Sequence, residues 1–289
     1  MKFTFSETII FSIFSILTLI FSTISCKSFL KNDSNELAIN SPLITTDEYV
    51  VKDKINREHS SFYTQGIFFD NNNNLIESGG LYGQSILIKM KFPELKEISR
   101  QNVNGNYFGE GTAKCGDYIY QLTWREGVIL KYKSCSLEKQ ESLTLDPEIG
   151  QGWGLSQSGD GNLYESNGSS RIYKLDCNNL KIMSYFDVIY KGGLLDNINA
   201  LAYAEGFIWA NRYYDSRIFK IDPVTGYVVE AYNMDPVVQW ELKNSKLTAG
   251  RLQSGDVLNG IAYNKSDPKN PYFLITGKKW DHYFTVYFK

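Results

Sequence analysis

The chain has 289 residues and a mass of 33.0 kDa, which is long for an average domain but ordinary for a single all-β barrel or propeller. Lys and Arg number 30 against 32 Asp and Glu, so no basic excess exists to neutralise phosphates, which excludes an electrostatic DNA- or RNA-binding protein. Apolar residues (43%) suffice for a sizeable core, and the aromatic content of 15% favours strands. Only two histidines occur, His59 and His282, which leaves almost no material for a His-ligated zinc site or a histidine-centred triad.

The first predicted element is an uncharged, mostly apolar segment from Thr8 to Ser25. It is typical of a secretory signal or a marginal membrane anchor. Small residues precede Cys26 at the end of this segment, a pattern that resembles a bacterial lipoprotein signal with Cys26 as the lipidated N-terminus. Plain cleavage and a retained anchor are the alternatives. All three place the folded part outside the cytoplasm, either tethered to a membrane or secreted.

Residues 26–46 are polar and lack a hydrophobic period, so they are predicted to form a tether. The chain is thus divided into a signal or anchor (1–25), this tether, and a folded domain (47–289). The domain contains Cys115, Cys135 and Cys177. In an oxidising compartment they allow one disulfide and leave one thiol, although three small buried or loop residues would fit the sequence equally well.

One pattern recurs five times in the domain: a short strand opening with a polar or aromatic residue and a small one, a turn, a second apolar strand and an alternating third strand. Successive openings are 45, 43, 46 and 60 residues apart, and the first three intervals match the length of a four-stranded propeller blade. The openings are Gln65-Gly66-Ile67-Phe68, Glu110-Gly111-Thr112-Ala113, Trp153-Gly154-Leu155-Ser156, Asn199-Ala200-Leu201-Ala202 and Asn259-Gly260-Ile261-Ala262.

The fifth unit ends with its third strand, Phe284–Phe288, and has no fourth. An orphan strand, Glu48–Lys52, precedes the first unit. If this strand is the outer strand of the last blade, the ring closes and an exposed edge disappears. The sequence therefore predicts an all-β fold, a five-bladed β-propeller closed by an N-terminal strand.

The start of each first strand and the end of each second strand lie on the same face of a meander. Aromatic walls with a few polar groups at one channel mouth are typical of a pocket for a small ligand. The openings bring Gln65, Glu110, Trp153, Asn199 and Asn259 to this mouth, and the second-strand ends bring Glu77, Thr123, Trp124, Asn211, Tyr213 and Lys278.

Structural roles compete with binding roles at several of these positions. Trp124 and Trp153 would also fit a propeller core, and Asn259 would fit the cap of a turn. Glu110 is harder to explain, because a carboxylate at a crowded channel mouth costs free energy unless it is solvated or paired. A salt bridge to Lys278 is its structural alternative. Cys115 and Cys135 of one blade are predicted to lie on the opposite face, where a disulfide between them is possible only through their loops and stays an open question.

Seven ordered motifs, extending from about Tyr49 to the C-terminus, resemble those of plant-type glutaminyl-peptide cyclotransferases, also called glutamine cyclotransferases. The resemblance implies a five-bladed propeller that converts the N-terminal glutamine of peptides or proteins to pyroglutamate and releases ammonia. The motifs are Tyr63-Thr64-Gln65-Gly66, Gly79–Ser85, Phe108-Gly109-Glu110-Gly111, Tyr120–Trp124, Gly152-Trp153-Gly154-Leu155, Val257–Tyr263 and Thr276-Gly277-Lys278.

By similarity, Glu110 matches the catalytic glutamate of the family. The family's pocket residues match Gln65, Phe108, Trp124, Trp153 and Lys278. The chain departs from the family pattern in blade four. It has Asn199-Ala200-Leu201-Ala202 in place of the usual Asn-Glu-Leu-Glu, and Tyr213 in place of the usual tryptophan.

The reaction itself needs few groups. The α-amine attacks its own γ-carboxamide in a five-membered ring closure, which positioning alone accelerates greatly. One carboxylate, Glu110, can carry the proton from the amine to the departing ammonia. Lys278, Asn199 or the Trp124 indole can donate to the developing charge on the amide oxygen. The predicted substrate-binding residues are Gln65, Phe108, Trp124, Trp153, Tyr213 and Asn259.

No metal or organic cofactor is required for these steps, and a structural divalent cation in the central channel is compatible with them. The expected partners are peptide or protein N-termini beginning with Gln, bound by a monomer that meets a membrane only through its N-terminal segment. A catalytically silent propeller that binds peptides or partner proteins, and a lectin-like or scaffold propeller, are the competing classes. The pocket around Glu110 discriminates them, since a scaffold has no need of it.

Overall fold

The computed structural model describes residues 42–57 and 62–289. The signal or anchor segment, the lipidation candidate Cys26 and the tether up to residue 41 lie outside these residues and stay predictions. No helix among the described residues is long and apolar enough to cross a membrane.

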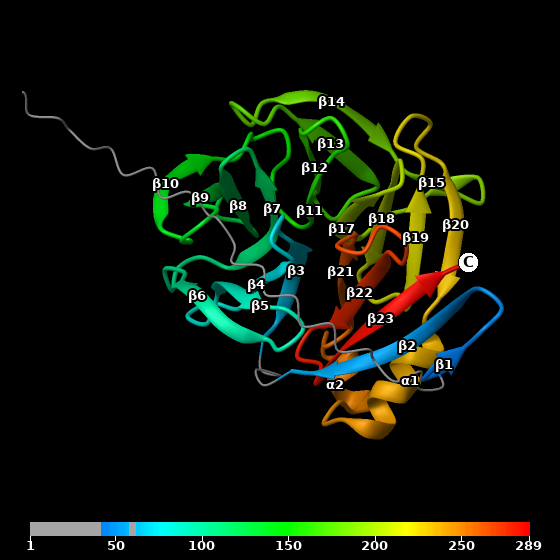
Figure 1. Ribbon diagram of the computed structural model, residues 1–289. Helices are drawn as coiled ribbons and strands as arrows, with labels where there is room; N and C mark the ends of the chain where they lie inside the picture. Colours follow the sequence, from blue (N-terminus) through cyan, green and yellow to red (C-terminus); the bar gives the residue numbers. More distant parts are fainter. Residues whose placement is uncertain (1–41, 58–61) are drawn as a thin grey trace, which may run out of the picture. The chain divides into compact units, whose positions relative to one another are not determined.

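Five antiparallel meanders stand around a central axis, each with its first strand innermost (Figure 1). Each inner strand contacts the inner strands of the two neighbouring blades. The five-bladed propeller is therefore confirmed. The first three blades are β3 (Thr64–Phe69), β4 (Asn74–Gly79), β5 (Ile86–Lys91) and β6 (Lys96–Asn102); β7 (Gly109–Cys115), β8 (Tyr118–Thr123), β9 (Val128–Lys133) and β10 (Lys139–Thr144); and β11 (Leu155–Gln157), β12 (Leu163–Ser166), β13 (Arg171–Leu175) and β14 (Ile182–Asp187).

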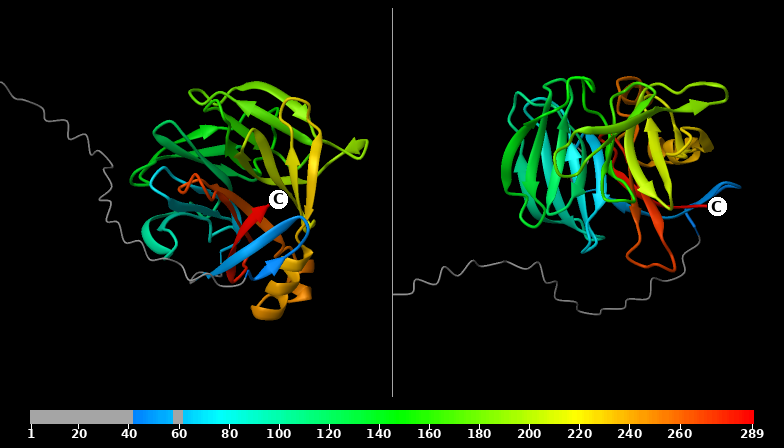
Figure 2. Two further views of the ribbon diagram at one scale, coloured as in Figure 1. Left: turned by 45° about the vertical axis from the view of Figure 1, so that its right-hand side comes forward. Right: turned by 90° about the horizontal axis from the view of Figure 1, so that it is seen from above.

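The fifth blade combines the two ends of the described chain, as the orphan strand predicts. Tyr49 pairs with Phe288 and Val50 with Tyr287, so the N-terminal strand covers the edge of the last one. The view from above in Figure 2 shows these segments side by side. Blade four is β17 (Ile198–Ala204), β18 (Phe207–Arg212), β19 (Arg217–Ile221) and β20 (Val228–Asn233), and blade five is β21 (Leu258–Asn264), β22 (Tyr272–Gly277), β23 (His282–Phe288) and β2 (Tyr49–Asn56), extended by β1 (Ile44–Thr45).

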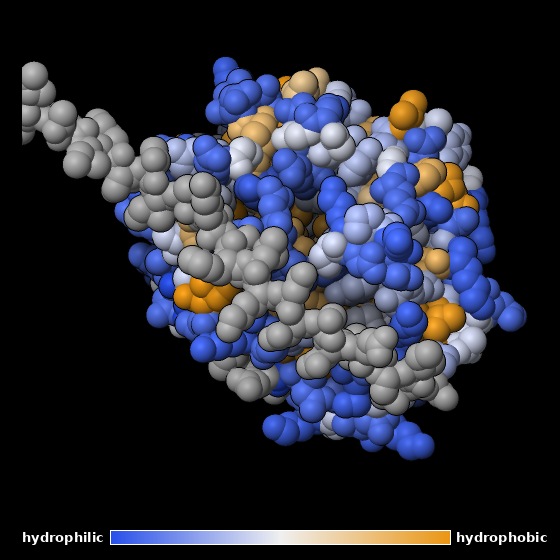
Figure 3. All heavy atoms as spheres, in the orientation of Figure 1, coloured by the Kyte–Doolittle hydropathy of each residue, from blue (hydrophilic) through white to orange (hydrophobic). Residues whose placement is uncertain are grey.

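Hydrophobic clusters fill the spaces between neighbouring blades. Among the described residues there is one such cluster at each of the five blade junctions. The cluster between blades four and five contains two buried tryptophans, Trp280 and Trp209. Each fully buried large apolar side chain contributes about 1.5–3 kcal/mol. Outside, the face seen in Figure 3 is mostly hydrophilic, with separate hydrophobic spots and a hollow near its centre.

The longer last interval of the repeat is explained by two helices that the strand pattern does not predict. Helix α1 (Asp235–Asn244) and helix α2 (Ala249–Gln253) lie between β20 and β21. Pro236 stands in the first turn of α1, where its missing N–H costs nothing. A small hairpin, β15 (Ile189–Tyr190) and β16 (Gly193–Leu194), adds the remaining strands between blades three and four.

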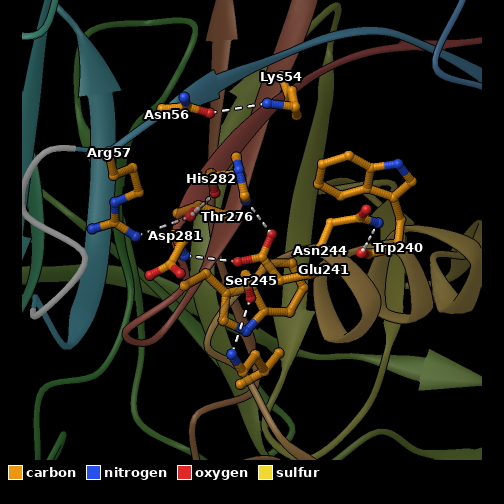
Figure 4. A network of polar contacts seen from close by, with 12 residues as sticks. Lys54, Asn56, Arg57, Trp240, Glu241, Asn244, Ser245, Thr276, Asp281 and His282 are labelled. Atoms are coloured by element: carbon orange, nitrogen blue, oxygen red, sulfur yellow. Dashed lines mark hydrogen bonds and ion pairs between the residues drawn. The ribbon is translucent and has the colours of Figure 1, made fainter.

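Glu241 fastens helix α1 to blade five (Figure 4). Its fully buried carboxylate accepts a hydrogen bond from the Asp281 amide at 2.7 Å and lies 2.8 Å from His282 Nδ1. Beside it in Figure 4, Arg57 donates to Thr276 Oγ1 at 3.0 Å. A buried carboxylate is tolerated because its oxygens are paired.

The structure decides the open question of whether Cys115 and Cys135 are bonded to each other: they are not. Cys115 bonds to Cys177, in the turn after β13, with Cα atoms 5.8 Å apart. Cys115 faces blade three and shares a cluster with Cys177, whereas the turn that contains Cys135 accepts hydrogen bonds from Lys89 of blade one. The expectation of a leftover thiol is wrong, since no cysteine among the described residues is free.

Candidate active site

A cavity of about 380 Å³ opens at one mouth of the central channel. A second hollow of about 410 Å³ occupies the other mouth, where it is lined by residues such as Thr112, Leu155 and Ala262. The first cavity gathers most of the predicted site residues. Its lining is Tyr63, Gln65, Leu81, Phe108, Glu110, Trp124, Trp153, Asn199, Tyr213, Ser254, Asp256, Lys278 and Lys279.

The opening residues reach this cavity through irregularities in the inner strands. The register shifts between Thr64 and Gly66, between Gly109 and Thr112, and between Ile198 and Leu201. A β-bulge of this kind re-aims a side chain and is common beside active sites. Gln65, Glu110 and Asn199 lie inside these three shifts.

Glycine at the second opening position allows the blades to approach closely. A Cβ atom on Gly154 would lie 2.0 Å from the Asn199 carbonyl oxygen, and one on Gly111 would lie 2.5 Å from the Trp153 carbonyl. The Gly111 amide donates to that same Trp153 carbonyl at 2.7 Å. Because any side chain would push the inner strands apart, these glycines fix the spacing of the functional groups.

Glu110 is the buried carboxylate of the cavity. Its Oε1 accepts a hydrogen bond from Gln65 Nε2 at 2.9 Å, across the junction of blades one and two. Burial raises the pKa of Glu110 well above its ordinary value, although the charge of Lys278 opposes the increase. Within the described residues no ion pair shorter than 4.0 Å joins Glu110 to Lys278, so the structural salt bridge is not found.

Lys278 is the buried cation of the same cavity. Burial lowers its pKa to about 8, against the opposing effect of Glu110. Its Nζ lies 4.6 Å from the centre of the Tyr63 ring and 4.8 Å from that of Tyr213. The two rings therefore stabilise the ammonium by cation–π contacts without neutralising it.

Asn199 presents an unused acceptor. It is 2% exposed, and its Oδ1 has no hydrogen-bond partner among the described residues. An unsatisfied buried oxygen costs free energy that a ligand donor would recover. Its backbone carbonyl is held by Ser166 Oγ at 2.8 Å, so the residue is fixed while the amide stays available.

Aromatic side chains form the walls. Phe108 and Trp124 have ring centres 5.7 Å apart, and Trp153 meets Tyr213 edge to face at 5.9 Å. The Tyr213 position that departs from the family pattern thus lines the cavity. The other two departures do not line this cavity. Ala202 lines the hollow at the opposite mouth, and Ala200 is buried without lining either hollow.

Four residues predicted at this mouth do not line the cavity. Asn259 lies behind Gln65 and donates to the Thr64 carbonyl at 2.9 Å. Glu77 points between blades one and five, where it pairs with Arg57 at 2.7 Å. Thr123 Oγ1 donates to the Val128 carbonyl, and Asn211 Oδ1 accepts from the Gly260 amide. The side chains of Glu77, Thr123 and Asn211 point away from the mouth because side chains alternate along a strand. A position at a strand end does not reveal to which side the side chain points.

The stretch after helix α2 supplies wall residues that the repeat does not predict, Ser254 and Asp256. Arg251 holds this stretch in place by two hydrogen bonds. Its Nε donates to Asp256 Oδ2 at 2.8 Å, and its Nη2 donates to the Lys279 carbonyl at 2.7 Å. Tyr63 OH donates to the Gly255 carbonyl at 3.3 Å. The longer last interval was the signal for an insertion here. Within residues 42–57 and 62–289, no cluster of three His, Cys, Asp or Glu is placed to hold a metal ion.

Comparisons with known proteins identify the family of this chain. The profile of the family described as glutamine cyclotransferase matches residues 23–288. The chain is 31% identical over 231 residues to the glutaminyl-peptide cyclotransferase of Arabidopsis thaliana, covering 78% of this chain and 67% of that protein. The crystal structure of Myxococcus xanthus glutaminyl cyclase is similar with a TM-score of 0.71 and 26% identity, over 83% of this chain and 95% of that one. This chain belongs to the glutamine cyclotransferase family.

Proposed function

We propose that the protein is a glutaminyl-peptide cyclotransferase, which converts an N-terminal glutamine to pyroglutamate and releases ammonia. The observation that carries the proposal is the buried Glu110 carboxylate, held by Gln65 within an aromatic cavity that also contains Lys278. The family membership of the chain supports the same reaction. The cavity volume of about 380 Å³ suits one side chain and the adjoining backbone.

Glu110 serves as the proton carrier. The substrate's α-amine attacks the γ-carboxamide carbon, and the new C–N bond closes the ring. Glu110 takes the proton that the attacking amine loses and delivers it to the departing nitrogen, so that the old C–N bond breaks with ammonia as the leaving group. The raised pKa of Glu110 suits both halves of this transfer, because the carboxyl accepts a proton more readily than an ordinary glutamate and then returns it to the leaving nitrogen.

Lys278 and Asn199 serve the two ends of the carboxamide. The Lys278 ammonium stabilises the negative charge that develops on the amide oxygen, in a cavity where water screens it little. The unpartnered Asn199 Oδ1 accepts from the carboxamide or the α-amine and orients it for attack. Phe108, Trp124, Trp153 and Tyr213 exclude water and fix the side chain in a folded conformation.

Release of ammonia from a Gln-initiated dipeptide by the purified full chain tests the proposal. Mass spectrometry of the peptide should show a loss of 17 Da, roughly the mass of one ammonia. An Asn-initiated dipeptide is the matched control, because its shorter side chain cannot close the same ring. Binding of the Gln peptide without any ammonia would favour the catalytically silent propeller instead.

We also propose an extracytoplasmic location, with Cys26 as the lipidated residue. The pattern before Cys26 supports lipidation, and the Cys115–Cys177 disulfide supports an oxidising compartment. Metabolic labelling with a fatty-acid analogue tests the lipid. Label that persists in Cys26→Ser would contradict the assignment.

A further inference from the structure

A polar groove lies beside the catalytic cavity, between blades two and three. It is an open hollow of about 480 Å³, and Arg125, Gln151, Asn167, Gly168 and Ser169 are among its lining residues. The proposed reaction leaves this groove unused, because ring closure involves only the first residue of the peptide.

Two tryptophans of the cavity wall contact residues of the groove. Trp153 lines the cavity, and its indole Nε1 donates to Gln151 Oε1 of the groove at 3.3 Å. The same ring packs on Gly168, where an added Cβ would lie 2.6 Å from it. Trp124 also lines the cavity, and the Arg125 guanidinium stacks on it at 3.7 Å. The groove therefore lies next to the cavity, on the other side of these two rings.

The stretch after helix α2 borders another side of the cavity. Tyr63 OH donates to the Gly255 carbonyl and Tyr214 OH to the Gln253 carbonyl, both at 3.3 Å. Arg251 binds the same stretch through Asp256. The groove lies away from this stretch, over blades two and three.

Arg125 differs from the other arginines of the described chain. Each of the other six lies within 4.0 Å of a carboxylate, whereas Arg125 has no such partner among the described residues. The neighbouring Glu126 is already engaged, because it accepts from Tyr82 OH at 2.7 Å and from the Phe108 amide at 3.3 Å. Arg125 is exposed, and stacking on the Trp124 ring holds its planar guanidinium group at the groove.

We propose that this groove binds the substrate residues that follow the N-terminal glutamine, and that Arg125 selects a carboxylate there. The proposal rests on the proposed function of the cavity. A guanidinium forms two parallel hydrogen bonds with a carboxylate, and stacking reduces the entropy lost when they form. The amide side chains of Gln151 and Asn167 line the path of the peptide backbone. The carboxylate belongs either to an acidic side chain or to the C-terminus of a dipeptide.

Matched peptides distinguish these sources. Gln-Glu-Ala amide is compared with Gln-Gln-Ala amide for the side chain, and Gln-Ala acid with Gln-Ala amide for the C-terminus. We expect the wild-type kcat/KM to favour the acid of at least one pair by about fivefold, the upper range of an exposed ion pair. Arg125→Ala should abolish that preference, and Arg125→Lys should retain part of it. Arg171→Ala, which removes a half-buried arginine stacked on the Tyr185 ring away from the groove, should leave it unchanged.

Equal kcat/KM for acid and amide in both pairs would overturn the proposal, as would an equal loss for both peptides in Arg125→Ala. Quenching of tryptophan fluorescence gives the dissociation constants of the same four peptides without requiring turnover. If no peptide is cyclised, the proposed function fails, and the fluorescence titration still decides the groove. An acid preference in binding that Arg125→Ala removes would support it, and equal constants would exclude it.

Discussion

Gln65 of blade one holds Glu110 of blade two by a single hydrogen bond, 2.9 Å from Nε2 to Oε1. The amide can only donate through this nitrogen, so the carboxylate orientation is fixed in both protonation states. Asn259 donates in turn to the Thr64 carbonyl, immediately before Gln65. The Glu110 carboxylate is thereby positioned by residues of three blades, and its geometry depends on the closed ring.

Glu110→Gln should lower turnover by about 100-fold or more, because it keeps the shape and the acceptor for Gln65 but removes the proton carrier. Thermal stability should change little, since Glu110 has no close ion pair to lose. The matched control is Glu165→Gln, which alters another fully buried carboxyl with a raised pKa outside the cavity. Measuring kcat and Tm on both variants checks this, and near-normal turnover of a folded Glu110→Gln protein would end the catalytic assignment.

The pH profile should be bell-shaped. Activity falls as pH decreases through the raised pKa of Glu110, because the carboxylate is then protonated and cannot accept. It falls again as pH rises through about 8, where Lys278 loses its charge. Lys278→Arg should shift the alkaline limb of kcat upward, because a guanidinium stays charged. The substrate amine titrates in the same way with the wild type and with Lys278→Arg. If the alkaline limbs of their kcat profiles coincide, the charge of Lys278 plays no part in the reaction.

Tyr213→Trp restores the residue usual in the family and should lower KM more than it changes kcat. Tyr213 meets Trp153 edge to face on the cavity wall, and a larger ring adds stacking mainly in the bound ground state. Tyr185→Trp, on the exposed outer strand of blade three, is the control. Steady-state kinetics at matched pH measure both constants. An unchanged KM would mean that the ring at this position does not contact the substrate.

Arg57→Met should lower the free energy of unfolding by about 3–5 kcal/mol, because it leaves the buried Glu77 carboxylate without its cation. Adding Glu77→Gln should recover part of that loss. Lys133→Ala breaks an exposed ion pair with Glu138 and should cost less than about 1 kcal/mol. Urea unfolding of the variants gives the comparison, and similar costs for Arg57→Met and Lys133→Ala would contradict the structural importance of the buried pair.

The ring could be predicted from the sequence because each blade repeats the same apolar strands, and because the missing fourth strand had one candidate. Glu110, Trp153 and Lys278 could be placed at one mouth because strand ends share a face. Asn199 and Asn259 both lie inside a bulge of their inner strand, yet only Asn199 lines the cavity, and one sequence holds no pattern that separates the two. Glu77 was misplaced because a position at a strand end does not reveal to which side the side chain points. Helix α1 was missed because its buried residues include a glutamate that is paired only in the fold.

The disulfide and the far wall of the cavity were beyond reach for a different reason. Cys115 of blade two is bonded to Cys177 of blade three, and the length of the repeat alone does not predict which turns of neighbouring blades come into contact. Asp256 lines the cavity because Arg251 and Tyr63 hold its stretch, and the Tyr63 contact arises only when blades one and five are adjacent. Such long-range pairings follow from the closed ring rather than from local spacing.

The joining of β2 to β23 also orders events during synthesis. Strand β2 emerges from the ribosome before the first blade, whereas its partner β23 is the last strand of the propeller to be made. Blades one to four can therefore form while β2 still has no partner, and blade five is completed only after β23 has emerged. The Lys289 amide lies 2.9 Å from the Glu48 carbonyl, so a short linker would join β23 to β2. New termini opened in another turn of the ring would then yield a circular permutant whose ring needs no late closure.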